Sequence, residues 1–73
     1  MDQELSNKLT EIARRHAEER GWAWIGDAQI TSESFKREAV WAVHSNAMMR
    51  GINVRVLVRK SDGAIVQSGY LPR

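Results

Sequence analysis

Histidine and serine are the residue types in this chain that could carry metal or nucleophilic chemistry. The chain has two histidines, His16 and His44, whereas a zinc site needs three or four converging ligands. His16 falls on the apolar stripe of a predicted helix and His44 ends a predicted strand, so packing or exposure accounts for both. Ser45 follows His44 directly, and neighbours on a strand point to opposite faces. We therefore expect no metal site and no serine–histidine pair.

The other catalytic arrangements are also missing from the pattern. Glu18 and Glu19 lie at a solvated helix end, and no other carboxylates pair in a plausible pocket. Gly51 and Gly63 are each expected in a turn, and they form no glycine-rich phosphate-binding loop. The chain has no cysteine, which removes disulfides, thiol chemistry and cysteine zinc sites. We expect a protein that is not an enzyme and that uses no cofactor.

Basic and apolar residues alternate on one face of a predicted strand, and this face is the candidate binding site. Arg55 and Arg59 flank Leu57 on it, and arginine can bind carboxylates or phosphates through two parallel hydrogen bonds. If the strand before it in the sequence lies alongside, further residues join the same face: Lys36, Glu38, Val40, Ala42 and His44. We also expect contacts from a neighbouring loop that holds Met48, Met49 and Arg50, because methionine adapts to different partners.

Several occupants fit such a face. A protein partner is favoured, because the positions expected to be exposed carry Leu57, Val40 and Ala42, whereas a single-strand nucleic-acid binder needs exposed aromatic rings. Nucleic-acid binding through the same basic groups is the alternative. A homodimer, through this face or through an edge strand at 64–71 or 22–31, is a third interpretation. A solvated face with no partner is the simplest one.

A helix and four strands must position these residues. Apolar residues recur at spacings of three and four over 3–20, which predicts an amphipathic helix. Asp2 is its expected N-cap, and Gly21 its expected terminating glycine. The period then changes to two. We predict strands over 22–30, 35–45, 52–60 and 64–71, with a polar loop at 31–34 and a hairpin turn at Ser61-Asp62-Gly63.

Short connections favour antiparallel neighbours, so the predicted fold is α+β, with the N-terminal helix packed on a four-stranded antiparallel meander. We expect the valines, Phe35, Trp41 and one or both of Trp22 and Trp24 to fill the core, since tryptophan usually serves the core of a small domain. The sheet face opposite the helix is then the one that carries Arg55 and Arg59.

Composition bounds the interpretation. The chain has 73 residues with 42% hydrophobic and 27% charged residues and a net charge of +2, which suits one small domain with a single core. Residues 1–21 carry net charge −1 and residues 22–73 net charge +3, a mild basic bias. No apolar run is long enough to span a membrane, and the N-terminus does not read as a signal peptide. We expect a cytoplasmic protein.

Three segments then suggest relatives: the strand at 39–43 with its W-x-V pattern, the G-x-x-V-x-V pattern at 51–56, and the D-G-x-V hairpin within 61–66. Together with a preceding helix they resemble small cystatin-like α+β domains, such as PepSY-type domains and immunity proteins of NTF2-like fold. The resemblance covers 35–71 best. It implies binding or inhibition, and supplies no residue motif to carry over. We predict a non-enzymatic protein-binding module, of inhibitor or immunity type.

Overall fold

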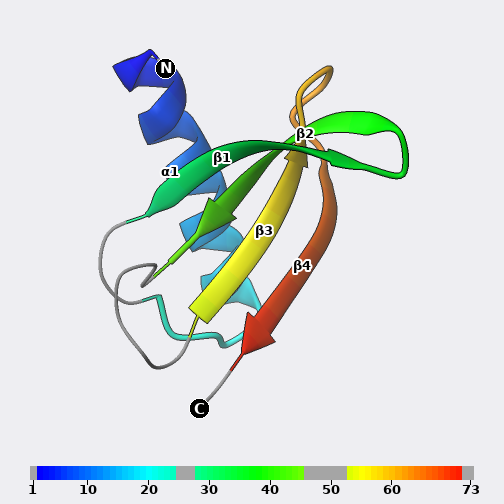
Figure 1. Ribbon diagram of the computed structural model, residues 1–73. Helices are drawn as coiled ribbons and strands as arrows, with labels where there is room; N and C mark the ends of the chain where they lie inside the picture. Colours follow the sequence, from blue (N-terminus) through cyan, green and yellow to red (C-terminus); the bar gives the residue numbers. More distant parts are fainter. Residues whose placement is uncertain (1, 25–27, 46–52, 72–73) are drawn as a thin grey trace.

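The computed structural model describes residues 2–24, 28–45 and 53–71. Helix α1 (Gln3–Glu19) is followed by strands β1 (Gln29–Phe35), β2 (Glu38–His44), β3 (Asn53–Arg59) and β4 (Ile65–Leu71). The strands form one antiparallel sheet in the order β1-β2-β3-β4, with α1 across one face (Figure 1). The predicted α+β architecture, one helix on a four-stranded meander, is confirmed.

Helix α1 begins and ends at the predicted caps. The Asp2 side chain accepts a hydrogen bond from the Glu4 amide, which satisfies one of the free N–H groups of the first turn. At the other end Gly21 has φ +73°, and the Trp22 amide donates to the Ala17 carbonyl at 2.8 Å. This pattern is a Schellman cap, which needs a residue with positive φ and so favours glycine.

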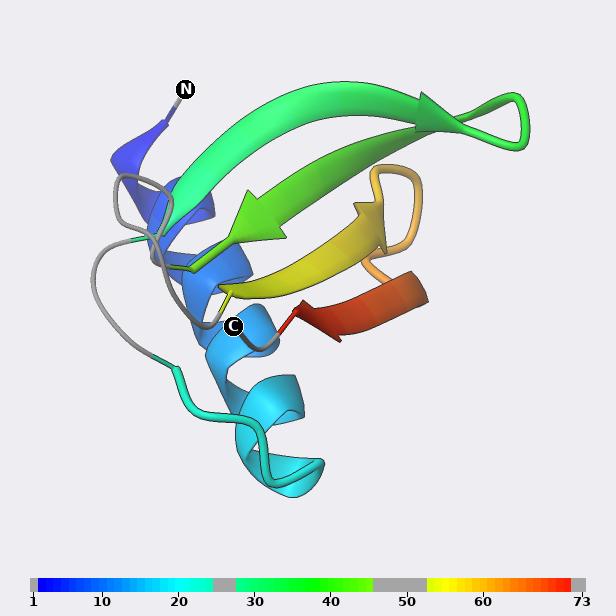
Figure 2. The ribbon, with the colours of Figure 1, turned by 60° about the horizontal axis from the view of Figure 1, so that its bottom comes forward.

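The core lies between α1 and the sheet (Figure 2). The helix stripe buries Leu9, Ala13 and Ala17 against valines of the two central strands, Val43, Val54, Val56 and Val58. All three tryptophans, Trp22, Trp24 and Trp41, pack against this cluster while partly exposed. Their predicted place in the core is therefore confirmed.

The first strand lies later in the sequence than its apolar residues predict. It covers Gln29–Phe35 and includes the predicted polar loop, whereas 22–24 lie outside any strand. The Schellman cap turns Trp22 back onto Tyr70 of β4, where the two rings stack 5.7 Å apart. Strand β1 pairs with β2 from Gln29↔His44 to Phe35↔Glu38. Backbone pairing with β2 thus stabilises β1, a polar edge strand in which apolar and polar residues do not alternate.

Phe35 therefore ends β1 instead of starting the next strand. The β1–β2 connection is the pair Lys36 and Arg37, with φ +50° and +68°. Two central residues of positive φ suit the right-handed twist of a tight hairpin. Because neither residue is glycine, asparagine or aspartate, the sequence carries no signal for this turn. The predicted strand 35–45 shortens to Glu38–His44.

The β3–β4 hairpin follows the prediction closely. Gly63 has φ +76°, and the Asp62 carboxylate accepts from the Ala64 amide at 3.0 Å. Strand β3 begins at Asn53, and β4 begins one residue later than expected, at Ile65. The register shifts between Val58↔Ile65 and Leu57↔Gln67, so Val66 is an extra residue in β4, as in a β-bulge.

Candidate partner-binding face

The sheet face opposite α1, here called the outer face, collects most of the predicted site residues. Cross-strand pairing sets Val40 beside Arg59, Ala42 beside Leu57 and His44 beside Arg55. Strand β1 adds Thr31, Glu33 and Phe35 through its pairs with Ala42, Val40 and Glu38. The expectation that the strand before β3 lies alongside it, with these residues on one face, is confirmed.

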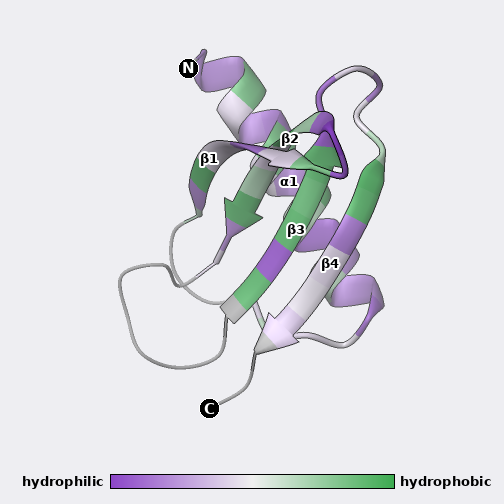
Figure 3. Cartoon of the chain, turned by 45° about the vertical axis from the view of Figure 1, so that its right-hand side comes forward, coloured by the Kyte–Doolittle hydropathy of each residue, from purple (hydrophilic) through white to green (hydrophobic). Residues whose placement is uncertain are grey.

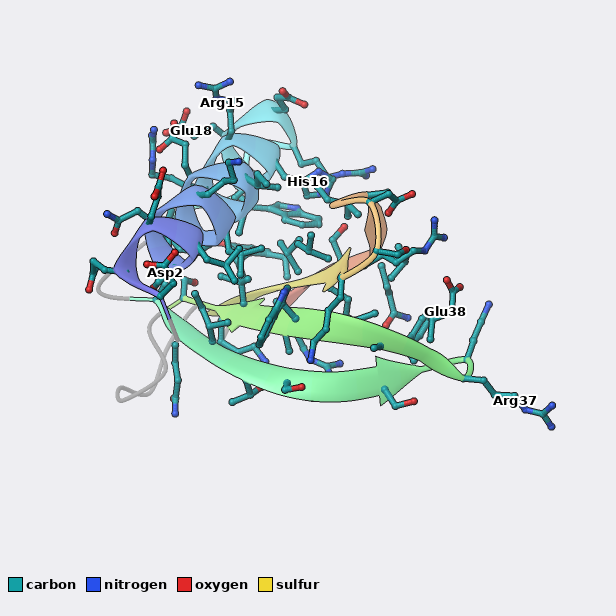
Figure 4. All side chains as sticks on the ribbon, turned by 90° about the horizontal axis from the view of Figure 1, so that it is seen from above. Asp2, Arg15, His16, Glu18, Arg37 and Glu38 are labelled. Atoms are coloured by element: carbon teal, nitrogen blue, oxygen red, sulfur yellow. The ribbon has the colours of Figure 1, made fainter. Side chains whose placement is uncertain are left out.

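Lys36 does not lie in the strand in which it was predicted. It lies in the β1–β2 turn, where its Nζ is 5.4 Å from the Phe35 ring centroid. The turn projects from the end of the sheet that is far from the start of α1, as Figure 4 shows for its neighbours Arg37 and Glu38. The predicted loop contacts Met48, Met49 and Arg50 lie outside the described residues.

The apolar centre of the outer face is not exposed, which corrects the expectation for these positions. Val40 and Ala42 are 0% exposed and Leu57 is 3% exposed. Together they form a second, smaller core, with Phe35 and Val66 packed against it. Figure 3 shows apolar residues running along β3, in keeping with a strand buried on both faces. This second core leaves less apolar surface for a partner than the alternation suggested.

Ion pairs close over the second core. Arg55 Nη2 lies 2.9 Å from Glu33 Oε1, and because β2 lies between their strands, this pair must cross over β2. Arg59 Nε lies 2.7 Å from Glu38 Oε2, and Arg59 Nη1 lies 3.0 Å from Asp62 Oδ2. The Arg59 Nε–H is not aligned with the Glu38 oxygen, so that contact is an ion pair without a hydrogen bond. Both predicted arginines are thus neutralised within the chain.

Two carboxylates of these pairs, Glu33 and Asp62, are stabilised in their ionised form. The Thr31 hydroxyl donates to Glu33 Oε2 at 2.9 Å. This hydrogen bond, and then the charge of Arg55, hold the pKa of Glu33 below its ordinary value. The backbone amide of Ala64, and then Arg59, lower the pKa of Asp62 in the same sense. These groups keep their charge near neutral pH, so the outer face presents fixed, alternating charges.

His44 is the one histidine on this face among the described residues. It is half-buried, and its Nε2 is shielded from solvent without a hydrogen-bond partner in the described part of the chain. Burial, and then the charge of Arg55, lower the pKa of His44, while Glu33 opposes the shift. The imidazole is therefore held in its neutral form.

The shift at His44 predicts a loss of stability in mild acid. Because the folded pKa lies below the ordinary value of 6.5, the unfolded chain takes up the proton first. Stability is then complete above about pH 6.5 and falls as the pH drops through the folded pKa. Urea midpoints measured at about pH 7.5 and 5.5 should differ less for His44→Gln than for the wild type. An equal acid loss in both proteins would contradict this assignment.

A small pit opens beside Arg55 on the outer face. It encloses about 150 Å³ and is lined by Arg55, Leu57, Gln67, Ser68 and Gly69. A Cβ added at Gly69 would meet no atom within 4 Å, so the missing side chain leaves the pit open. The sequence analysis placed the returning strand beside β3 but missed Gln67 and Gly69 as site residues. Counting along both strands from the Asp62–Gly63 turn could have set them close to Leu57 and Arg55. The bulge at Val66 shifts that count by one residue.

The remaining histidine has a structural place. His16 Nε2 lies 2.8 Å from Ser68 Oγ and accepts from Arg20 Nε at 3.0 Å, and its ring meets Trp22 edge-on. This packing between α1 and β4 agrees with the interpretation from sequence. No group of three or more metal-ligating side chains occurs within 2–24, 28–45 and 53–71. In these same ranges no helix has the length and apolar character to cross a membrane.

Comparisons with protein families, with curated proteins and with solved structures find no match to this chain. The fold and the outer face therefore carry the functional argument alone.

Proposed function

We propose that this chain is a non-catalytic protein-binding module that recognises a carboxylate-bearing segment of a partner protein through its outer face. The observation that carries the proposal is the open pit beside Arg55. The Arg55 side chain is 44% exposed and is held by Glu33 at 2.9 Å. A partner carboxylate in the pit would meet a guanidinium that is already oriented, and this lowers the entropy cost of binding.

The charges on the outer face favour a protein over a nucleic acid. Nucleic-acid affinity depends on a surplus of cations that neutralise phosphates, but the ion pairs of the outer face set Glu33, Glu38 and Asp62 against only Arg55 and Arg59. Stacking of bases needs exposed aromatic rings, whereas Phe35 is partly buried against the second core. A pit lined by Arg55 and by the polar residues Gln67 and Ser68 suits the polar contacts of a protein interface.

Binding through this face supports an occlusion mechanism. The rigid sheet would cover a site on the partner, as an inhibitor or immunity-type protein does. A homodimer through the same face is disfavoured, because Val40, Ala42 and Leu57 are already buried within the chain. The cytoplasm is the compartment in which we expect this activity, as for a chain without cysteine.

Filling the pit tests the proposal. The tagged protein is used to recover partners from a lysate of the source cells with and without nuclease, and the affinity for the recovered partner is then measured. Gly69→Leu should weaken binding about tenfold or more, the loss of roughly 1.4 kcal/mol. Ser34→Leu places the same side chain at an exposed strand position outside the outer face and should leave the affinity unchanged.

Exchanging the Arg55–Glu33 pair separates charge recognition from stability. Arg55→Glu alone would place two carboxylates together, whereas Arg55→Glu combined with Glu33→Arg keeps the ion pair and moves the cation to β1. The double variant should fold normally and still lose the partner. Unchanged affinity in both this variant and Gly69→Leu would refute the proposal, and recovery that depends on intact nucleic acid would favour the nucleic-acid alternative.

A further inference from the structure

Strand β4 is an outer strand of the sheet and lacks the usual protection of an edge. Natural edge strands carry charges or proline that block pairing with another chain. Ile65–Leu71 contains neither a charged residue nor a proline. A bulge at Val66 lies near its start, and Pro72 and Arg73 follow its end in the sequence. Strand β1, the opposite edge, carries Glu33 and leads into Lys36 and Arg37. Among the described residues, β4 is therefore the edge strand better suited to pair with a further strand.

A groove runs along the flank of α1 and meets this edge at Ile65, the first residue of β4. It encloses about 300 Å³, twice the volume of the pit on the outer face. Its floor is formed by Ile12, His16 and Ile65, and none of the three is fully buried. The apolar floor and the unprotected strand are adjacent, so one occupant could cover both.

The walls of the groove carry charges in an alternating order. Lys8, Glu11, Arg15 and Glu19 line it, and their signs along the helix are plus, minus, plus and minus. Figure 4 shows Arg15 directed away from the sheet. Glu11 and Arg15 contact each other at 3.4 Å, whereas Lys8 and Glu19 form no ion pair with another described residue.

This order is complementary to itself when reversed. A second α1 that runs antiparallel along the groove sets its Glu19 opposite Lys8 and its Arg15 opposite Glu11. Lys8 and Glu19 are 11 positions apart on one flank, about 16 Å at 1.5 Å per residue, so two-fold symmetry brings both pairs together at once. In such an isologous interface each contact occurs twice.

We infer that a second copy of this chain occupies the groove. Strand β4 pairs antiparallel with the partner's β4, the two helices face each other across the two-fold axis, and the two sheets join into one. Ile12 and Ile65 become buried, and Lys8 pairs with the partner's Glu19. The outer face of each copy stays on the side of the sheet opposite the helices, and three residues that line its pit, Gln67, Ser68 and Gly69, belong to the strand that pairs. The inference does not rest on the proposed function.

A charge exchange on the full chain tests this interface. Sedimentation equilibrium should show a dimer for the wild type. Lys8→Glu and Glu19→Lys should each weaken dimerisation about tenfold or more, since each loses two ion pairs and gains like-charge contacts. The double variant restores opposite charges across the axis and should return to nearly wild-type association. Arg37→Glu, at the exposed β1–β2 turn, is the matched control and should dimerise normally.

Three results would overturn the inference: a wild-type monomer at millimolar concentration, a dimer indifferent to both single reversals, or a double variant as weak as either single one. Circular dichroism of each variant confirms that the fold is retained. Because Lys8 and Glu19 lie on the exposed flank of α1, their reversal leaves the outer face intact, and partner binding should persist in every variant.

Discussion

Val43→Asp should leave this protein largely unfolded at room temperature. Val43 is 0% exposed and pairs with Ile30 on one side and Val56 on the other, so a carboxylate there has no cation or donor beside it. The effective penalty for burying an unpaired charge is several kcal/mol. A domain of 73 residues has a total stability of roughly 4–11 kcal/mol, so this one substitution consumes most or all of it.

The matched control for Val43→Asp lies on the same strand and the same side of the sheet. Ala39 is two pleats away and exposed, so Ala39→Asp adds the same charge without burying it. Far-ultraviolet circular dichroism during urea unfolding should show a cooperative transition for Ala39→Asp and little or none for Val43→Asp. A wild-type midpoint in Val43→Asp would contradict the packing of α1 against β2.

Leu57→Ala should lower the free energy of unfolding by about 2–5 kcal/mol, the cost of removing a buried leucine side chain. The reason is the second core, in which Leu57 packs with Val40 and Ala42 under the ion pairs of the outer face. If Leu57 were exposed, as the strand alternation predicts, the same change would cost less than about 0.5 kcal/mol. Urea unfolding monitored by tryptophan fluorescence measures the difference.

Gln67→Ala is the control for Leu57→Ala, because Gln67 is the exposed cross-strand neighbour of Leu57 on the same face. It should change stability by less than about 0.5 kcal/mol. If Leu57→Ala and Gln67→Ala had equally small effects, the second core would be disproved, and the apolar centre of the outer face would again be available to a partner.

The elements that the sequence predicted well are those whose signal is local. The apolar residues over 3–20 predict a helix because only a helix brings residues at spacings of three and four to one face. The observed helix α1 ends one residue earlier than expected. Strand β3 was predictable because its residues alternate between the two faces of the sheet. The β3–β4 turn was predictable because Gly63 can adopt a positive φ. In each case the residues that decide the structure are close together in the chain.

Strand β1 shows why a local signal can mislead. Trp22 and Trp24 alternate like a strand, but the cap at Gly21 directs Trp22 to stack on Tyr70, far away in the chain. Thr31–Ser34 look like a loop because they are polar, yet the whole segment pairs with β2. A polar edge strand gains its stability from the backbone of its neighbour, which its own side chains do not reveal.

The sequence by itself determined the helix, the meander and the face on which Arg55, Arg59, Val40 and His44 gather, since periodicity assigns each residue to a side of its element. Only the tertiary structure decided which residues of that face are buried, which are ion-paired and which line a pit. Glu33 reaches Arg55 across 22 positions of chain, Phe35 and Val66 pack against the second core, and the register of β3 and β4 sets Gly69 opposite Arg55 at the pit. These features depend on strand register and sheet curvature, which arise from contacts between distant segments and leave no pattern in any one of them.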